Sequence, residues 1–290
     1  MRAEPPVLDY GESTYEKDFW PGRDYEDAAD RHALRRLLPA TGARLLEIGA
    51  GYGRLANLYA GYEQVILLDY SPNLLRDARL RLAINPPLTV AASFYDMPFA
   101  DGALDVAVMV RVLHHAADVP AVLQEIRRIL RPGGLLILEH ANKRHFKAVL
   151  RYALRRGPNP HTDEPLEFAR LNYDFHPAYV RRHLAAAGFT VEQERAVSTF
   201  RLPLFKRIFS PTLLGRFDAA LQRPLSPLRL SPSIYLRCRA NGTPPDPLVQ
   251  RPLFRCPHCS SVRLEPAGPS LACRDCGAAW SCADGIYSFR

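Results

Sequence analysis

The sequence predicts an α/β protein with a doubly wound, mostly parallel sheet, followed by a small module that a metal ion holds together. Two observations support this fold class. Short apolar segments alternate with segments of helical periodicity over most of the chain, as expected for a sheet covered by helices on both faces. Two Cys-x-x-Cys pairs near the C-terminus have the spacing of a four-thiolate metal site.

The elements follow one another in a regular order. Strands are expected at 45–48, 65–69, 89–94, 104–110, 135–138, 189–200 and 233–240. Helices are expected at 27–38, 55–60, 119–130 and 177–187. The Pro-Gly-Gly run at 132–134 separates a helix from the next strand. Two insertions, about 141–176 and 201–230, lie beyond strand ends, where open α/β sheets carry substrate-selecting elements.

The turn after the first strand has the pattern Glu-x-Gly-x-Gly-x-Gly, from Glu47 to Gly53. Glycines let the backbone turn sharply and lie against a ligand. Arg54 stands where a dinucleotide fingerprint requires its third glycine. Glu47 would repel a pyrophosphate but suits a ligand that carries an ammonium group. Asp69 ends the second strand, where an acid can accept both hydroxyls of a ribose.

This order of motifs resembles the S-adenosylmethionine (SAM) site of class I methyltransferases, closely from Gly42 to His140 and more loosely to about Ala240. The ubiquinone/menaquinone-type branch matches best, and the resemblance implies a Rossmann-like sheet of seven strands. It also implies that Asp96 takes the adenine amine, while Met97 offers its backbone N–H and an apolar wall. The implied SAM-binding residues are Glu47, Gly49, Ala50, Gly51, Gly53, Asp69, Tyr70, Asp96, Met97 and Arg111.

Methyl transfer from a sulfonium is an in-line displacement, so the enzyme mostly supplies alignment. A base is needed only if the acceptor loses a proton. The segment after the fourth strand faces the methyl group in related enzymes, and it contains His114 and His115, the candidate catalytic residues. Each could equally be a structural histidine that lines the pocket. Glu139, Asn142 and His176 are further pocket candidates.

Cys256, Cys259, Cys273 and Cys276 form the second motif. Four thiolates in two such pairs bind Zn²⁺ as a structural tetrahedron, and iron is the alternative. The segment 280–286 resembles the zinc-ribbon activator of tRNA and protein methyltransferases. We expect a methyltransferase domain at 1–241, a proline-rich linker at 242–252 and a zinc ribbon at 253–290. The ribbon could also serve only as a folding or docking element.

Charge is unevenly distributed: residues 1–140 carry a net charge of −4 and residues 141–290 a net charge of +12. A basic half suggests an anionic partner such as RNA, an acidic metabolite or a membrane surface. The thiol-rich motif, with no signal peptide or long apolar run, predicts a cytoplasmic protein. The sequence leaves the oligomeric state open.

Three functions remain in view. The first is methyl transfer from SAM to a small, lipophilic or anionic acceptor. The second is RNA methylation that uses the basic half and the ribbon. The base-amine loop Asn/Asp-Pro-Pro-Tyr is absent after the fourth strand, which argues against exocyclic amines as targets. The third is a non-enzymatic SAM-binding or zinc-dependent interaction protein, against which the intact Glu47, Asp69 and Asp96 argue.

Overall fold

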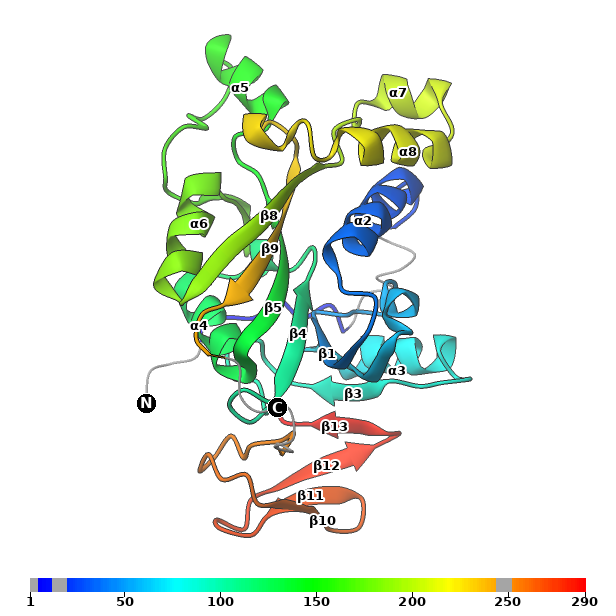
Figure 1. The fold of residues 1–290 in the computed structure, drawn as a ribbon, viewed down its shortest axis with the longest axis vertical. Helices are drawn as coiled ribbons and strands as arrows, with labels where there is room; N and C mark the ends of the chain where they lie inside the picture. The colour runs from blue at the N-terminus through cyan, green and yellow to red at the C-terminus, as the bar shows by residue number, and fades with distance from the viewer. Residues whose placement is uncertain (1–4, 12–19, 244–251) are drawn as a thin grey trace.

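The computed structural model describes residues 5–11, 20–243 and 252–290. Its main feature is a sheet of eleven strands in the order β10-β11-β12-β13-β3-β2-β1-β4-β5-β9-β8 (Figure 1). The strands of its larger part are β1 (Gly42–Ile48), β2 (Tyr62–Asp69), β3 (Leu88–Ala91), β4 (Leu104–Met109), β5 (Leu130–Ala141), β8 (Phe189–Val197) and β9 (Ser233–Ala240). The strands β3, β2, β1, β4 and β5 pair in parallel, and β9 pairs antiparallel with both β5 and β8. The predicted seven-stranded, mostly parallel sheet is therefore confirmed.

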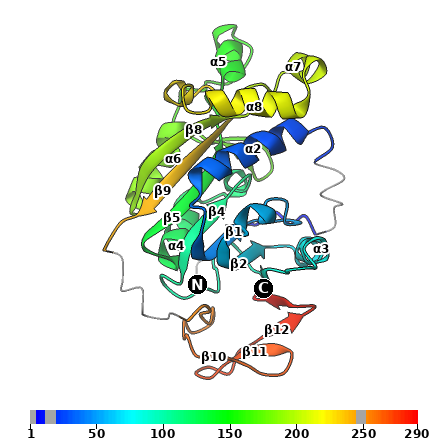
Figure 2. The same cartoon turned by 45° about the vertical axis from the view of Figure 1, so that its right-hand side comes forward.

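Helices cover both faces of this sheet (Figure 2). The helices with buried residues are α2 (Asp24–Leu37), α3 (Pro72–Arg81), α4 (Val119–Ile129), α6 (Pro177–Ala186) and α8 (Pro211–Leu221). Apolar residues of α4 and α6 pack on one face, while those of α2 and α8 pack on the other. The central strands are buried on both sides, which explains why they are continuously apolar.

Three local predictions need correction. The segment expected to be a helix at 55–60 is a 3-10 helix, η1 (Ala56–Tyr59), because β2 begins only three residues later and leaves no room for an α-helix. The third strand ends at Ala91 rather than at residue 94. The fifth strand starts at Leu130, because the Pro-Gly-Gly run is accommodated as a register shift against β4.

The two insertions lie together at one end of the molecule (Figures 1 and 2). The first contains α5 (Phe146–Ala153) and the hairpin β6 (Leu166–Ala169) and β7 (Asn172–Asp174). The second contains α7 (Pro203–Ile208), α8 and the 3-10 helix η3 (Ser226–Leu228). The short helix η2 (Leu113–His115) follows β4 beneath the first insertion. None of the described helices is long and apolar enough to cross a membrane.

The strands of the C-terminal module continue the main sheet. Its strands are β10 (Leu264–Pro266), β11 (Ser270–Cys273), β12 (Ala279–Ala283) and β13 (Ile286–Ser288). The last of them pairs in parallel with β3, and the Phe289 N–H donates to the Ala91 carbonyl at 2.8 Å. The ring of Phe254 stacks on that of Phe99, with 5.9 Å between centroids. Most of the predicted linker at 242–252 lies outside the described residues.

Candidate active site

The turn after β1 is shaped by three glycines in the left-handed region. Gly49, Gly51 and Gly53 have φ of 69°, 55° and 73°, a conformation that disfavours any residue with a Cβ. A Cβ at Gly49 would lie 2.3 Å from Cγ2 of Val112. Only glycine fits there without displacing its neighbours, so the backbone itself forms the wall of the cleft next to this turn.

Asp69, at the end of β2, fixes this turn. One carboxylate oxygen accepts the Gly51 N–H at 2.8 Å, and the other accepts the Ser71 N–H at 2.9 Å. Burial raises the pKa of this carboxyl group. Asp69 and the neighbouring Tyr70 both line the cleft.

Glu47 lines the same cleft from β1, and only 4% of it is exposed. Burial raises the pKa of its carboxyl group to about 8. No described residue forms a hydrogen bond with its buried Oε2 atom. A buried polar atom without a partner is costly, and a cationic ligand would remove that cost. The ammonium group of SAM therefore fits this position.

The N-terminal segment 5–11 closes the cleft from the side. Val7, Leu8 and Tyr10 line it, together with Trp20. The empty space amounts to about 730 Å³, part of it open to solvent.

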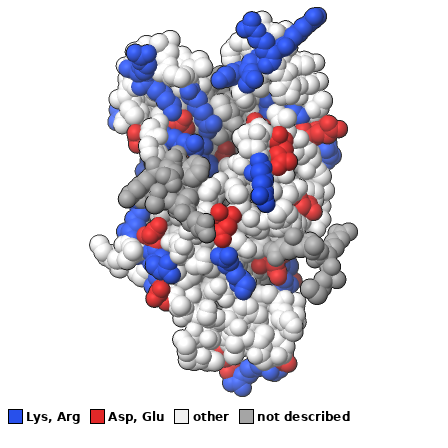
Figure 3. Space-filling view, turned by 180° about the vertical axis from the view of Figure 1, so that it is seen from behind, with Lys and Arg blue, Asp and Glu red and all other residues white. Residues whose placement is uncertain are grey.

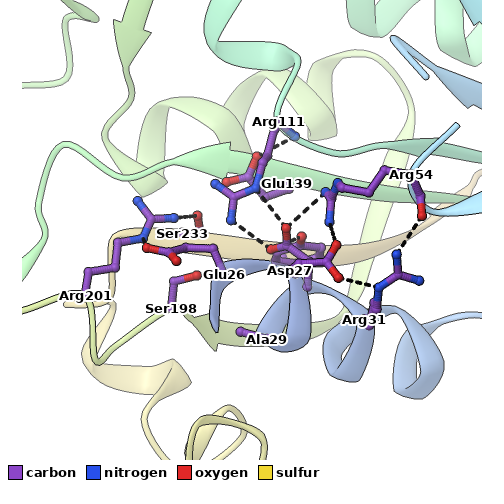
Figure 4. Close-up of polar contacts among 12 residues, drawn as sticks. Glu26, Asp27, Ala29, Arg31, Arg54, Arg111, Glu139, Ser198, Arg201 and Ser233 are labelled. Carbon is purple, nitrogen blue, oxygen red and sulfur yellow. Dashed lines mark hydrogen bonds and ion pairs between the residues drawn. The ribbon is translucent and has the colours of Figure 1, made fainter. Parts of the chain in front are cut away.

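A buried ion cluster lies between the cleft and α2. Asp30 is fully buried and accepts hydrogen bonds from Arg111 at 2.8 and 3.1 Å, from Arg54 at 3.1 Å and from the Tyr235 hydroxyl at 2.8 Å. These cations are the main groups that hold the pKa of Asp30 below its ordinary value against the effect of burial. Figure 4 shows Arg54 and Arg111 pointing toward α2. The Arg111 guanidinium is thus already bonded to a protein carboxylate.

A second cavity adjoins the cleft and shares Tyr10, Arg111 and His115 with it. Its empty space is about 1100 Å³, part of it open to solvent. The wall is formed mainly by β5, the two insertions and η2. Among the described residues, those that line only this cavity of the two are Arg23, His114, Glu139, Ala141, Asn142, His145, Phe168, Asn172, Asp174, Arg201, Pro232 and Ser233.

Arg201 lines this second cavity, and its guanidinium lies beside Ser233 and Glu26 (Figure 4). One guanidinium nitrogen donates to the Ser233 hydroxyl at 3.2 Å. The buried Nε atom has no hydrogen-bond acceptor among the described residues, and it lies 4.0 Å from a Glu26 oxygen. Lys206 already neutralises Glu26, at 2.6 and 2.9 Å. Burial, followed by the nearby Arg111, lowers the pKa of Arg201, so an anion in the cavity would be stabilised.

His115 lies between the two cavities. Its Nδ1 atom is 2.9 Å from the Leu171 carbonyl oxygen, and its Nε2 atom is 3.3 Å from the Tyr10 hydroxyl. A carbonyl can only accept, so Nδ1 carries the proton and the lone pair is on Nε2. Burial lowers the pKa of His115. Burial and the neighbouring His115 also lower the pKa of His114. The lowered pKa favours the neutral imidazole, whose Nε2 can accept a proton.

Comparisons with known proteins agree with this geometry. A family described as "Methyltransferase domain" matches residues 46–138. A demethylmenaquinone methyltransferase of Tropheryma whipplei is 30% identical over 176 residues, which cover 58% of this chain and 72% of that protein. The chain belongs to the class I SAM-dependent methyltransferases. A 2-phytyl-1,4-naphtoquinone methyltransferase of Trichormus variabilis is 32% identical over 39% of this chain and 54% of its own length.

Solved structures support the fold of this methyltransferase. A chain from the complex between the Haloferax volcanii Trm112 methyltransferase activator and a methyltransferase matches with a TM-score of 0.58. The match has 20% identity and covers 82% of this chain and all of that chain. A Thermotoga maritima SAM-dependent methyltransferase matches with a TM-score of 0.56, at 20% identity, over 80% of this chain and 98% of that chain.

Most of the predicted SAM-binding residues gather at the cleft of the methyltransferase. Those that line it are Glu47, Gly49, Ala50, Gly51, Asp69, Tyr70 and Arg111. Gly53 lies behind the turn, where a Cβ would come within 3.2 Å of Ala78 and Leu82. Its role is close packing against α3.

Asp96 and Met97, which are predicted to hold the adenine, are not among the residues that line the cleft. Asp96 is exposed, and Met97 is fully buried with its N–H donating to Glu125 at 2.8 Å, so neither lines the cleft. Phe94 lines it instead.

Sequence reasoning identified some pocket residues and missed others. Glu139 and Asn142 line the second cavity, whereas His176 lines neither of the two cavities and caps α6. Segment 5–11 and Arg54 were missed. The local sequence around segment 5–11 and Arg54 does not predict their place at the cleft, because the residues that they contact come from distant segments.

The four predicted cysteines come together in the C-terminal module, with their Sγ atoms all within 4.8 Å of one another. Two of the Sγ–Sγ separations are 3.7 Å, between Cys256 and Cys276, and 3.5 Å, between Cys259 and Cys273. Tetrahedral zinc with bonds of about 2.3 Å requires about 3.8 Å between sulfurs. The donor set and its dimensions fit a zinc ion.

Proposed function

We propose that this methyltransferase methylates a ring carbon of a small phenol- or quinol-type acceptor, which binds in the second cavity as an oxyanion. The proposal is carried by Arg201, a buried donor without a full set of acceptors in the wall of that cavity. The names of the relatives, which are quinone methyltransferases, support the acceptor class.

SAM would occupy the first cleft, with Glu47 beside its ammonium group, Asp69 at its ribose and Phe94 near its adenine. Gly49, Ala50, Gly51 and Tyr70 would shape the surface against which it lies. When bound, SAM supplies an electrophilic methyl group on sulfur. The protein contributes alignment, because the two cavities meet at Arg111, His115 and Tyr10.

The proton balance assigns a role to His115. An oxyanion held by Arg201 makes the neighbouring ring carbon nucleophilic. The new carbon–carbon bond forms as the sulfur–methyl bond breaks, and the ring carbon must then lose its proton. Nε2 of His115 is the basic atom between the two cavities and would accept that proton. His114 lies behind it, with 3.9 Å between the ring centroids, and would fix its orientation.

The C-terminal module would bind one structural Zn²⁺ through Cys256, Cys259, Cys273 and Cys276. We also propose the domain division at 1–241 and 253–290. A module of this size buries too little surface to fold alone, so the metal and the pairing with β3 would stabilise it together.

The test uses SAM and a reduced 1,4-naphthoquinone with a short prenyl chain, with product detected by mass spectrometry. Arg201→Ala should lower kcat/KM by roughly 100-fold, as expected for the loss of about 3 kcal/mol of a charge-assisted contact. The affinity for SAM should not change. Arg170→Ala, which alters an exposed arginine at the nearby β6–β7 turn, is the matched control. Equal kcat/KM for the two variants, or methyl incorporation into RNA alone, would refute the proposal.

A further inference from the structure

Exposed apolar side chains are concentrated on the two insertions. Among the described residues, 13 of the 16 large exposed hydrophobic side chains lie between positions 146 and 228. Neither α5 nor α7 buries any residue in the core. Apart from Phe205 of α7, which packs partly buried against the core, these two helices leave their large apolar side chains outside it.

These side chains form stripes along their helices. On α8, Leu213, Phe217 and Leu221 recur every four residues and face outward, while the opposite side packs on α2. Phe146 and Leu150 show the same spacing on α5, and so do Leu204 and Ile208 on α7. Positions four apart share one side of a helix. Exposed apolar stripes of this kind are typical of an interaction site.

Basic residues flank the stripes, and acids are scarce. Between positions 141 and 156 the chain has no acidic residue, whereas Lys147, Arg151, Arg155 and Arg156 are exposed there. Between 201 and 230 the only acid is Asp218, which is buried. Figure 3 shows lysine and arginine side chains gathered at this end of the molecule.

The second cavity is lined by residues that adjoin both stripes. His145, which caps α5, and Arg201, which precedes α7, line this cavity. Phe168 also lines it and is 61% exposed. The apolar helices therefore adjoin the cavity. Figures 1 and 2 place α5, α7 and α8 at the same end of the fold, opposite the C-terminal cysteine module.

We propose that α5, α7 and α8 form a docking surface for an anionic lipid bilayer. Apolar stripes can enter the region between headgroups and acyl chains, while lysines and arginines pair with the anionic headgroups. RNA would use the cations but gain nothing from exposed leucine and isoleucine side chains. If the proposed function holds, a lipid-soluble acceptor could pass from the bilayer into the second cavity without crossing water.

The test is flotation of the full-length protein with vesicles of phosphatidylglycerol and phosphatidylcholine in equal parts, compared with phosphatidylcholine alone. We expect at least tenfold stronger binding to the anionic vesicles. Raising NaCl from about 0.05 M to about 0.5 M should weaken that binding, since salt screens the headgroup attraction. The double variants Phe146→Glu with Leu150→Glu, and Leu204→Glu with Ile208→Glu, should each reduce binding at least tenfold.

Leu80→Glu with Ile84→Glu is the matched control, because these side chains are 72% and 103% exposed on and just after α3. It should bind vesicles like the unchanged protein. Circular dichroism melting would verify that all three double variants fold. Binding to neither vesicle type, equal losses in control and docking variants, or retention by RNA but not by vesicles would each overturn the proposal. None of these outcomes bears on methyl transfer to a soluble acceptor, so failure here is distinguishable from failure of the proposed function.

Discussion

Replacing Gly49 by alanine tests the geometry of the cofactor turn directly. The substitution forces a Cβ into a backbone with φ of 69° and places it 2.3 Å from Cγ2 of Val112. The left-handed conformation costs about 1–2 kcal/mol and overpacking about 1–3 kcal/mol, so we expect a loss of about 2–5 kcal/mol in the free energy of unfolding. Urea denaturation measures this loss.

Gly22 offers a control that separates the two effects. Its φ is 72°, but among the described residues, apart from its two chain neighbours, no atom lies within 4 Å of the position its Cβ would take. Gly22→Ala should therefore lose only the conformational part, about 1–2 kcal/mol. In Gly49→Ala, the additional substitution Val112→Ala should relieve the close contact. The double variant should therefore lose less unfolding free energy than the sum of the two single variants. If Gly49→Ala is no more destabilising than Gly22→Ala, the proposed close approach at this turn is wrong.

Three further perturbations address the cofactor, the base and the metal. Asp69→Ala should weaken SAM binding at least tenfold in calorimetry, because the turn loses its carboxylate acceptor; unchanged affinity would exclude Asp69 from the site. His115→Asn should lower kcat while leaving the Kd for SAM unchanged, and a matching loss in Kd would instead mean a structural role. Metal analysis should find about one zinc per chain, and Cys273→Ser should lower both the zinc content and Tm. An unchanged Tm after zinc removal would contradict a structural role for zinc.

The pH dependence of stability should show the raised pKa of the Glu47 carboxyl group. Its pKa is raised to about 8 in the folded protein from an ordinary value of 4.5. Between these values the folded state binds more protons than the unfolded state, so the stability of the SAM-free protein should fall as pH rises from about 5 to about 8. Glu47→Gln should flatten this part of the profile. A wild-type curve that rises more steeply than that of Glu47→Gln over the same range would contradict the assignment.

The sheet was predictable because each buried strand is apolar and each turn carries its own glycine or proline. The cofactor turn was predictable for the same reason, since Gly49 and Asp69 act through local backbone geometry. Errors arose where the outcome depends on distant partners. Arg111, for example, is bound by Asp30, which lies 81 positions away in the chain.

The docking of the ribbon could not be predicted either. The pairing of β13 with β3 uses backbone groups that any short strand offers, so residues 286–288 carry no signal for it. Likewise, α5 looks amphipathic in sequence, but nothing in the chain shows that its apolar side remains outside the core.

Contacts of Arg290, which follows β13 of the ribbon, link the ribbon to the cofactor cleft. Arg290 donates to the Tyr70 carbonyl at 2.9 Å and lies over the Tyr70 ring, while its other nitrogen is 3.4 Å from Asp9. Tyr70 lines the cleft, and Asp9 belongs to the segment that closes it. The Arg290 side chain thus contacts two walls of the cofactor cleft. Because Arg290 belongs to the same chain as Tyr70 and Asp9, dilution of the protein does not weaken these contacts.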